Sequence, residues 1–119
     1  MRKGRKISGG RYHQARKKKL YEKPGQARTV RLGEEKRKTQ RITGGNLKTV
    51  LFKTKFINVL VGGKNKRVEI KDVLETPSNR YLARQNVLTK GTIVNTELGK
   101  VKVTNRPSQE GLVNGILIE

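Results

Sequence analysis

The sequence has no cysteine, no tryptophan, and only one histidine and one aspartate. Without cysteine, neither a disulfide framework nor a zinc site built on cysteine ligands can form. His13 lies inside a basic stretch and Asp72 lies in an expected strand, so neither has the convergent partners that a metal site or an acid–base pair requires. We therefore expect no enzymatic activity, no bound metal, no cofactor and no small-molecule substrate.

Apolar residues are scarce in the first third of the chain. Four Val, Ile, Leu or Met residues lie between Arg2 and Arg41, whereas most aliphatic side chains lie beyond Ile42. No apolar run approaches the roughly 20 residues that span a membrane, and the N-terminus lacks the apolar stretch of a signal peptide. We therefore expect a soluble, cytoplasmic protein whose core lies in the C-terminal two thirds.

Positive charge is concentrated in the N-terminal half. Residues 1–55 carry 19 Lys and Arg against three Glu, a net charge of +16, whereas residues 56–119 carry a net charge of +4. The first segment repels itself unless a polyanion neutralises it. A membrane surface is a poorer candidate, because the chain shows neither an amphipathic apolar face nor a lipidation site. Nucleic acid is therefore the expected partner, with no membrane contact and no homo-oligomer.

The composition divides the chain into a basic arm, residues 1–41, and a folded domain, residues 42–119. Glycines and the Pro24-Gly25 pair interrupt the first 25 residues, and no apolar stripe recurs at helical spacing. We therefore expect the arm to be largely irregular, disordered alone and ordered on its target. A turn is expected at residues 43–46, because glycine and asparagine readily adopt positive φ.

The folded domain has an all-β pattern, in which short segments rich in Val, Ile, Leu and Thr alternate with turn residues. Val68, Ile70 and Leu74 are expected to face inward, and residues 112–118 are apolar on both faces, as in a central strand. Short strands and short loops favour a small closed or partly open β-barrel, which hides strand edges. The expected strands are residues 47–53, 55–61, 67–74, 92–96, 100–104 and 112–118, with a loop at 62–66 and a helical turn at 80–85.

A nearly continuous series of cations along the arm fits a phosphate backbone better than a compact acidic protein. On charge alone, the barrel is expected to dock on RNA through Lys48, Lys53, Lys55 and residues 64–67. The arm cations expected to contact RNA are Arg2, Lys3, Arg5, Lys6, Arg11, Arg16, Lys17, Lys18, Lys19, Lys23, Arg28, Arg31, Lys36, Arg37, Lys38 and Arg41.

Some uncharged residues are further candidates for RNA contact. Tyr12 and Tyr21 either stack on unpaired bases, a habit of RNA-binding proteins, or are incidental. His13 is a candidate phosphate or base contact, and Gly9-Gly10 either lets backbone N–H groups approach phosphates or simply gives flexibility. The Gly44-Gly45-Asn46 turn is a strand entry with RNA contact as an added possibility.

Separate motifs, in the right order, resemble one ribosomal family. The segment Arg5-Lys6-Ile7-Ser8-Gly9-Gly10-Arg11, then Arg16-Lys17-Lys18-Lys19 and Glu22, resembles the N-terminal signature of the S-eight-e family, which is small ribosomal subunit protein eight of the archaeal–eukaryotic type. Residues 32–38 and 44–48 resemble the middle of that family. Residues 89–94, 97–100 and 103–107 resemble its C-terminal barrel, and residues 113–119 resemble the ending of its archaeal members.

This resemblance implies a structural constituent of the small subunit, located in the cytoplasmic ribosome, with a small β-barrel and an arm that penetrates RNA. Its implied partners are small-subunit rRNA and neighbouring small-subunit ribosomal proteins. The lack of insertions typical of eukaryotic members indicates the archaeal type. The alternative is a ribosome-assembly factor with a related barrel, although those factors resemble longer proteins, and a DNA-compacting basic protein is a third reading.

Overall fold

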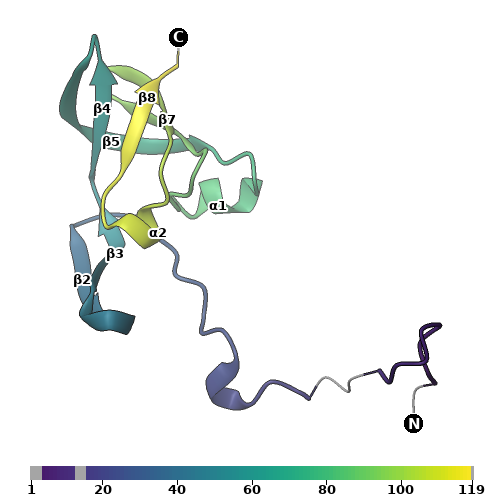
Figure 1. Ribbon diagram of the computed structural model, residues 1–119. Coiled ribbons are helices and arrows are strands. Elements are labelled where there is room, and N and C mark those ends of the chain that lie inside the picture. The colour runs from purple at the N-terminus through teal and green to yellow at the C-terminus, as the bar shows by residue number, and fades with distance from the viewer. Residues whose placement is uncertain (1–3, 13–15, 119) are drawn as a thin grey trace.

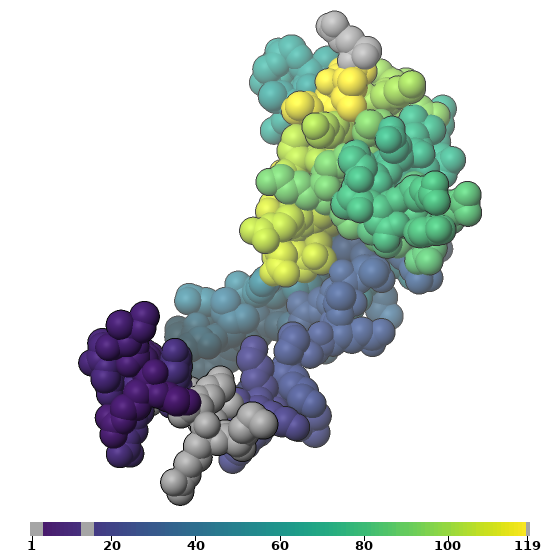
Figure 2. All heavy atoms as spheres, turned by 90° about the vertical axis from the view of Figure 1, so that its right-hand side faces the viewer, coloured from purple at the N-terminus to yellow at the C-terminus, as the bar shows by residue number. Residues whose placement is uncertain are grey.

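The computed structural model describes residues 4–12 and 16–118, which form a folded body and a long N-terminal arm (Figure 1). The molecule measures 64 × 34 × 29 Å, and its Cα radius of gyration is 20.5 Å. A compact chain of this length has a radius of gyration of about 13.5 Å, so the arm extends well beyond the body. Figure 2 shows the barrel and the N-terminal segment at opposite ends of the molecule.

Five strands close into a barrel in the order β4-β5-β6-β7-β8. Neighbouring strands are antiparallel, except that β8 pairs with β4 in parallel. Closure leaves none of the five with a free edge, and the predicted all-β fold with a small barrel is confirmed. The barrel strands are β4 (Phe56–Val61), β5 (Lys64–Glu75), β6 (Ile93–Thr96), β7 (Gly99–Val103) and β8 (Asn114–Leu117).

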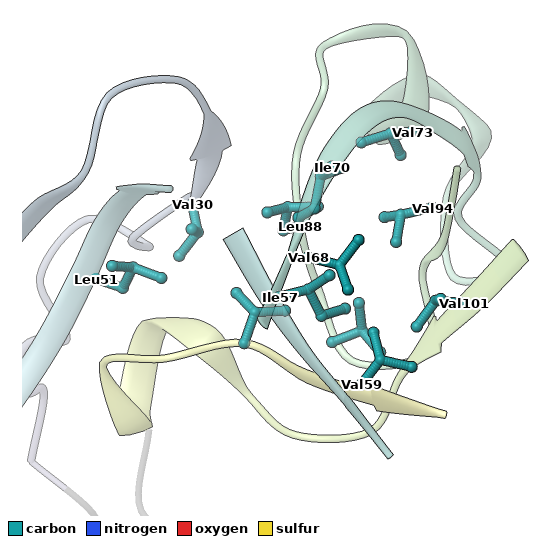
Figure 3. Close-up of a cluster of buried hydrophobic side chains, with 12 residues drawn as sticks. Val30, Leu51, Ile57, Val59, Val68, Ile70, Val73, Leu88, Val94 and Val101 are labelled. Carbon is teal, nitrogen blue, oxygen red and sulfur yellow. The ribbon is translucent and has the colours of Figure 1, made fainter. Parts of the chain in front are cut away.

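Aliphatic side chains from alternate strand positions fill the barrel. Ile57 and Val59 of β4 and Val101 of β7 are buried (Figure 3), and so is Val103 of β7. Gly115 of β8 lies among them, and a Cβ atom at that position would lie 2.4 Å from Val101 Cγ1 and 2.9 Å from Ile57 Cδ1. The barrel therefore requires glycine at this point of its closing strand, because any side chain would displace two core residues.

A second, three-stranded sheet, here called the N-terminal sheet, connects the arm to the barrel. The expected strand at residues 47–53 is the centre of this sheet and not a barrel strand. Val30 and Leu51 of this region belong to the same buried cluster as the barrel residues (Figure 3). The sheet has the order β1-β3-β2, with β1 (Arg31–Leu32), β2 (Lys36–Arg41) and β3 (Leu47–Thr54).

The arm is anchored to the body where β1 begins. β1 pairs in parallel with β3 on one side. On its other side, Leu88 N donates to Val30 O at 2.7 Å, and Leu32 N donates to Asn86 O at 2.9 Å. These partners follow α1 (Arg80–Arg84), which confirms the predicted helical turn. The remaining short helices are η1 (Leu20–Glu22), η2 (Thr43–Gly45) and α2 (Pro107–Glu110).

β5 is longer and more irregular than the sequence predicts. Gly62 and Gly63 both take positive φ, 55° and 78°, which is the geometry of a two-residue hairpin turn. β5 therefore begins at Lys64, and the prediction of a longer loop is wrong. Register shifts against β6 bury Val73 and leave Leu74 45% exposed. The prediction that Leu74 faces inward is wrong because a bulge interrupts strict alternation.

Two further differences concern β2 and β8. The sequence does not predict β2, because Lys36–Arg41 is polar on both faces and forms a strand only through backbone pairing with β3. β8 is paired on both edges as expected, but only one of its faces is buried. Gly115 points into the barrel, whereas Ile116 is 45% exposed on the outside, so the prediction of two buried faces is wrong.

Candidate RNA-binding surface

The described tip of the arm is a tight turn carrying three cations. Gly9 N donates to Lys6 O and Lys6 N donates to Gly10 O, both at 2.9 Å. Arg5 pairs with Arg11 in an isolated antiparallel bridge, and Arg5 Nη1 donates to Gly9 O at 3.0 Å. Gly9 has a φ of 78°, so it serves the turn, which holds Arg5, Lys6 and Arg11 close together on an exposed loop.

Glu22 organises the second basic cluster. Arg16 donates from both terminal nitrogens to the Glu22 carboxylate, at 2.8 and 2.5 Å, and Lys19 N donates to Glu22 Oε2 at 3.0 Å. The Arg16 guanidinium and the Lys19 backbone hold the pKa of the Glu22 carboxyl below its usual value of 4.5. Arg16 is thus already paired with a carboxylate, whereas Lys17, Lys18 and Lys19 are exposed next to η1 and form no ion pair with any residue that the structure describes.

Both tyrosines of the arm are exposed. Tyr12 is 50% exposed and Tyr21 is 78% exposed. The ammonium group of Lys6 lies 5.8 Å from the centroid of the Tyr12 ring, within the range of a cation–π contact. Neither ring is buried in the core, so both rings are accessible for stacking on an unpaired base.

Three cations lie side by side across the N-terminal sheet. Lys53 at the centre of the sheet is opposite Arg31 on β1 and opposite Lys36 on β2. All three side chains are exposed, and within the described part of the chain none of them is in an ion pair. Like charges directly opposite each other on a sheet are destabilising. This row therefore favours an anion on its surface.

A groove of about 560 Å³ lies along this row of cations. Its lining combines positive charge with one aromatic ring, and contains no carboxylate. The lining residues are Thr29, Arg31, Lys36, Arg37, Lys38, Phe52 and Lys53.

Glu35 sits beside the groove and connects the two sheets. Its carboxylate pairs with Arg37 of β2, and Arg67 Nη2 of β5 donates to Glu35 Oε2 at 3.0 Å. The Arg67 guanidinium also lies 4.3 Å from the centroid of the Phe56 ring. Arg37 and Arg67 are therefore partly neutralised by the protein itself, and Arg67 lies in a strand, as the sequence predicts.

The predicted turn at residues 43–46 is confirmed, and it joins β2 to β3. Gly44 and Gly45 have φ values of 78° and 77°, and Ile42 N donates to Asn46 O at 2.8 Å. Lys48, just beyond the turn, is half-buried, and its ammonium group donates to the Gln109 side chain. Lys48 is thus less available to an external ligand than the sequence suggests.

The structure distributes the remaining candidates along the outside of the arm and the N-terminal sheet. Arg28 donates to the Gln40 side chain at 3.1 Å. Three candidates, Arg2, Lys3 and His13, lie outside the described residues. Residues that the sequence does not single out are Phe52, Thr29 and Glu35, because their importance depends on strand register. The other exposed candidates are Lys23, Lys38, Arg41, Lys53 and Lys55.

Other classes of site find no support within residues 4–12 and 16–118. In this part of the chain no helix has the length and apolar character required to cross a membrane. Nor does any group of three His, Cys, Asp or Glu side chains there come together in a way that would hold a metal ion. The chemistry of the described surface is that of exposed cations with a few aromatic rings.

The chain is similar to archaeal ribosomal proteins over nearly its whole length. Residues 1–118 match the family model described as ribosomal protein S8e. The protein named small ribosomal subunit protein eS8 from Nanoarchaeum equitans is 46% identical over 120 residues, covering 99% of this chain and 94% of the relative. Its counterpart in Staphylothermus marinus is 47% identical over 118 residues, covering 97% and 92%. The one in Methanocorpusculum labreanum is 42% identical over 117 residues, covering 97% and 94%.

Proposed function

The chain belongs to the ribosomal protein S8e family, and from that membership we propose that it holds small-subunit rRNA together by neutralising phosphates with its arm and N-terminal sheet. As a member it is a structural protein of the small ribosomal subunit and not an enzyme, and it is located in the ribosomes of the cytoplasm. The proposal concerns how it binds, and which residues do so.

The observation that supports the proposal most is the excess of positive charge over carboxylates in the first 30 residues. Residues 1–30 carry 11 Lys and Arg and one carboxylate, Glu22, which is used by Arg16. Phosphate oxygens neutralise such cations and release the condensed counterions of the nucleic acid, which drives binding. Arginine adds bidentate geometry at single phosphates, and lysine adds mobile point charge. The arm is therefore suited to lie between RNA segments that otherwise repel each other.

The body gives the arm a fixed origin. The buried Val30 joins the core, and the cations of the N-terminal sheet continue the positive surface beyond it. We expect this sheet to face rRNA together with the arm. The outer face of the barrel, where Leu60 and Ile116 are exposed, is then left for neighbouring small-subunit proteins.

The salt dependence of binding tests the proposal. We expect the full chain to bind fragments of small-subunit rRNA with log K falling linearly against log salt. If about ten phosphates are neutralised, the slope is near −9 on a duplex and near −7 on a single strand. A filter-binding titration between low and moderate salt measures it. A slope close to zero would show that charge does not carry the interaction.

An assembly factor, the alternative that the sequence suggests, is disfavoured by the lengths of the relatives. The chain covers 94% and 92% of the length of two relatives named as small-subunit proteins, which favours a resident protein. Sucrose gradients of tagged protein at low and high salt separate the two. A structural protein stays in mature small subunits at high salt, whereas a factor is found only in immature particles.

A further inference from the structure

We propose that the groove beside Phe52 binds one unpaired base of the RNA, an inference that rests on the proposed function and assigns it a specific site. The groove has a volume of about 560 Å³, and binding sites for small organic groups typically measure about 300–1,000 Å³. Its lining joins five cationic side chains to a single aromatic ring, that of Phe52. A nucleotide has the matching composition, an anionic phosphate next to a flat ring.

A β-bulge directs Phe52 into the groove. Between the pairs Lys36–Lys53 and Arg37–Leu51, β3 advances by two residues while β2 advances by one, so Phe52 is the extra residue. Consecutive residues of a regular strand point to opposite faces. A bulge breaks this alternation and redirects a side chain, which explains why Phe52 and its neighbour Lys53 line the same groove. Phe52 is only half-buried, so its ring is not fully used by the core.

The row of cations supplies the second, independent argument. Arg31, Lys53 and Lys36 oppose one another across three strands and have no carboxylate among the groove residues. Val30 is buried, whereas its neighbours Thr29 and Arg31 are exposed and line the groove. Glu35 pairs with the groove residue Arg37 and with Arg67. Arg37 is therefore partly neutralised, whereas Arg31, Lys36 and Lys53 keep their positive charge for a ligand.

The ring and the charges together favour an unpaired base over the other anions. An acidic peptide would satisfy the cations, but its carboxylates offer no flat face for the ring. A continuous duplex would also satisfy the cations, but its bases are stacked inside the helix and cannot reach Phe52. Only a base extruded from the stack, as at a bulge or in a loop, engages both features. Stacking of this kind tolerates any base, so we expect little preference among the four.

The test compares two RNA stem–loops that differ by a single bulged nucleotide. We expect the full chain to bind the bulged RNA about tenfold more tightly than the fully paired RNA, because stacking of one base on an aromatic side chain is worth about that factor or more. Phe52→Leu keeps an apolar side chain of similar size and removes the ring. It is expected to lose most of the preference while its affinity for the paired RNA changes by less than about twofold.

Phe56→Leu is the matched control, because Phe56 is the other phenylalanine of the chain and is exposed on the barrel. Phe56→Leu should keep the preference for the bulged RNA.

A 5-iodouridine at the bulge supplies a second measurement on the unaltered chain, since irradiation crosslinks it to a stacked aromatic residue. A crosslink at Phe52 supports the site. Crosslinks confined to Tyr12 or Tyr21, or a preference that Phe52→Leu retains, would overturn it. If the unaltered chain bound neither RNA, that result would instead overturn the proposed function.

Discussion

The arm and the barrel of this protein are held in shape by different forces. From residue 4 to residue 29, no described residue is buried, and the order that exists comes from local hydrogen bonds around Gly9 and Glu22. From Val30 onward, buried aliphatic side chains and a closed ladder of strands hold the chain. The body is thus stabilised by burial, whereas the arm offers charge and depends on what it contacts.

Removal of residues 1–25 should have the largest effect on RNA binding, because it deletes most of the charge of the arm. The truncated chain loses ten Lys and Arg residues, and none of the removed residues that the structure describes is buried. We expect its affinity for small-subunit rRNA at about 0.1 M salt to fall by roughly 100-fold or more, with a shallower salt slope. Filter binding measures the affinity, and thermal unfolding should show an unchanged midpoint for the body. An unchanged affinity would mean that the arm does not bind the RNA.

The same small substitution should lower stability in the barrel but not in the arm. Gly115→Ala adds a methyl group that meets Val101 and Ile57 inside the barrel, and we expect it to lower the free energy of unfolding by about 1–3 kcal/mol. Gly25→Ala adds the same group to the arm, where nothing lies within 4 Å. Denaturant titration should show no loss for that control, and equal values for the two variants would contradict the contrast.

Glu35 joins the N-terminal sheet to the barrel through its ion pairs, so its removal should lower stability and raise RNA affinity. Glu35→Gln breaks two exposed ion pairs, with Arg37 and Arg67, and we expect a loss of a few tenths to about 1 kcal/mol in unfolding free energy. The freed arginines should raise RNA affinity about twofold. Glu97→Gln removes one charge in a barrel loop and serves as the control. A weaker affinity for Glu35→Gln would show that Glu35 positions the groove cations.

The smallest expected effect is confined to the arm and depends on pH. Because the folded pKa of Glu22 lies below its usual value of 4.5, the contact with Arg16 stabilises the turn fully above pH 4.5 and is lost as pH falls through the lowered pKa. The NMR shift of the Lys19 amide should report this transition. Glu22→Gln should abolish it while barrel amides stay unchanged, and a titration that persists in that variant would assign it to another group.

The sequence predicts the barrel well because buried apolar residues recur at alternate positions along its strands. Val101 and Val103 alternate with lysines and do face inward, as do Ile57 and Val59. The prediction fails where strand pairing is not accompanied by such a pattern of apolar residues. β2 is a strand with no buried side chain, and the bulges at Phe52 and Leu74 shift the register without any change in residue type.

The candidate RNA surface, too, could be predicted from the sequence only in part. Its charge is visible in the sequence, because cations stay exposed wherever they fall in the chain. Which cations are free is not visible. The pairing of Arg16 with Glu22 and of Lys48 with Gln109 emerges only from the folded arrangement. The position of Phe52 beside Lys53 follows from a register that no local pattern encodes.

The anchoring of β1 has a consequence for the order of events during synthesis. The segment around Val30 leaves the ribosome before its partners, which are Lys53 of β3 and the residues from Asn86 to Leu88. Its docking is therefore delayed until about three quarters of the chain has been made, and the barrel itself closes only when β8 meets β4. A nascent chain thus presents a loose, strongly basic segment while its body is incomplete.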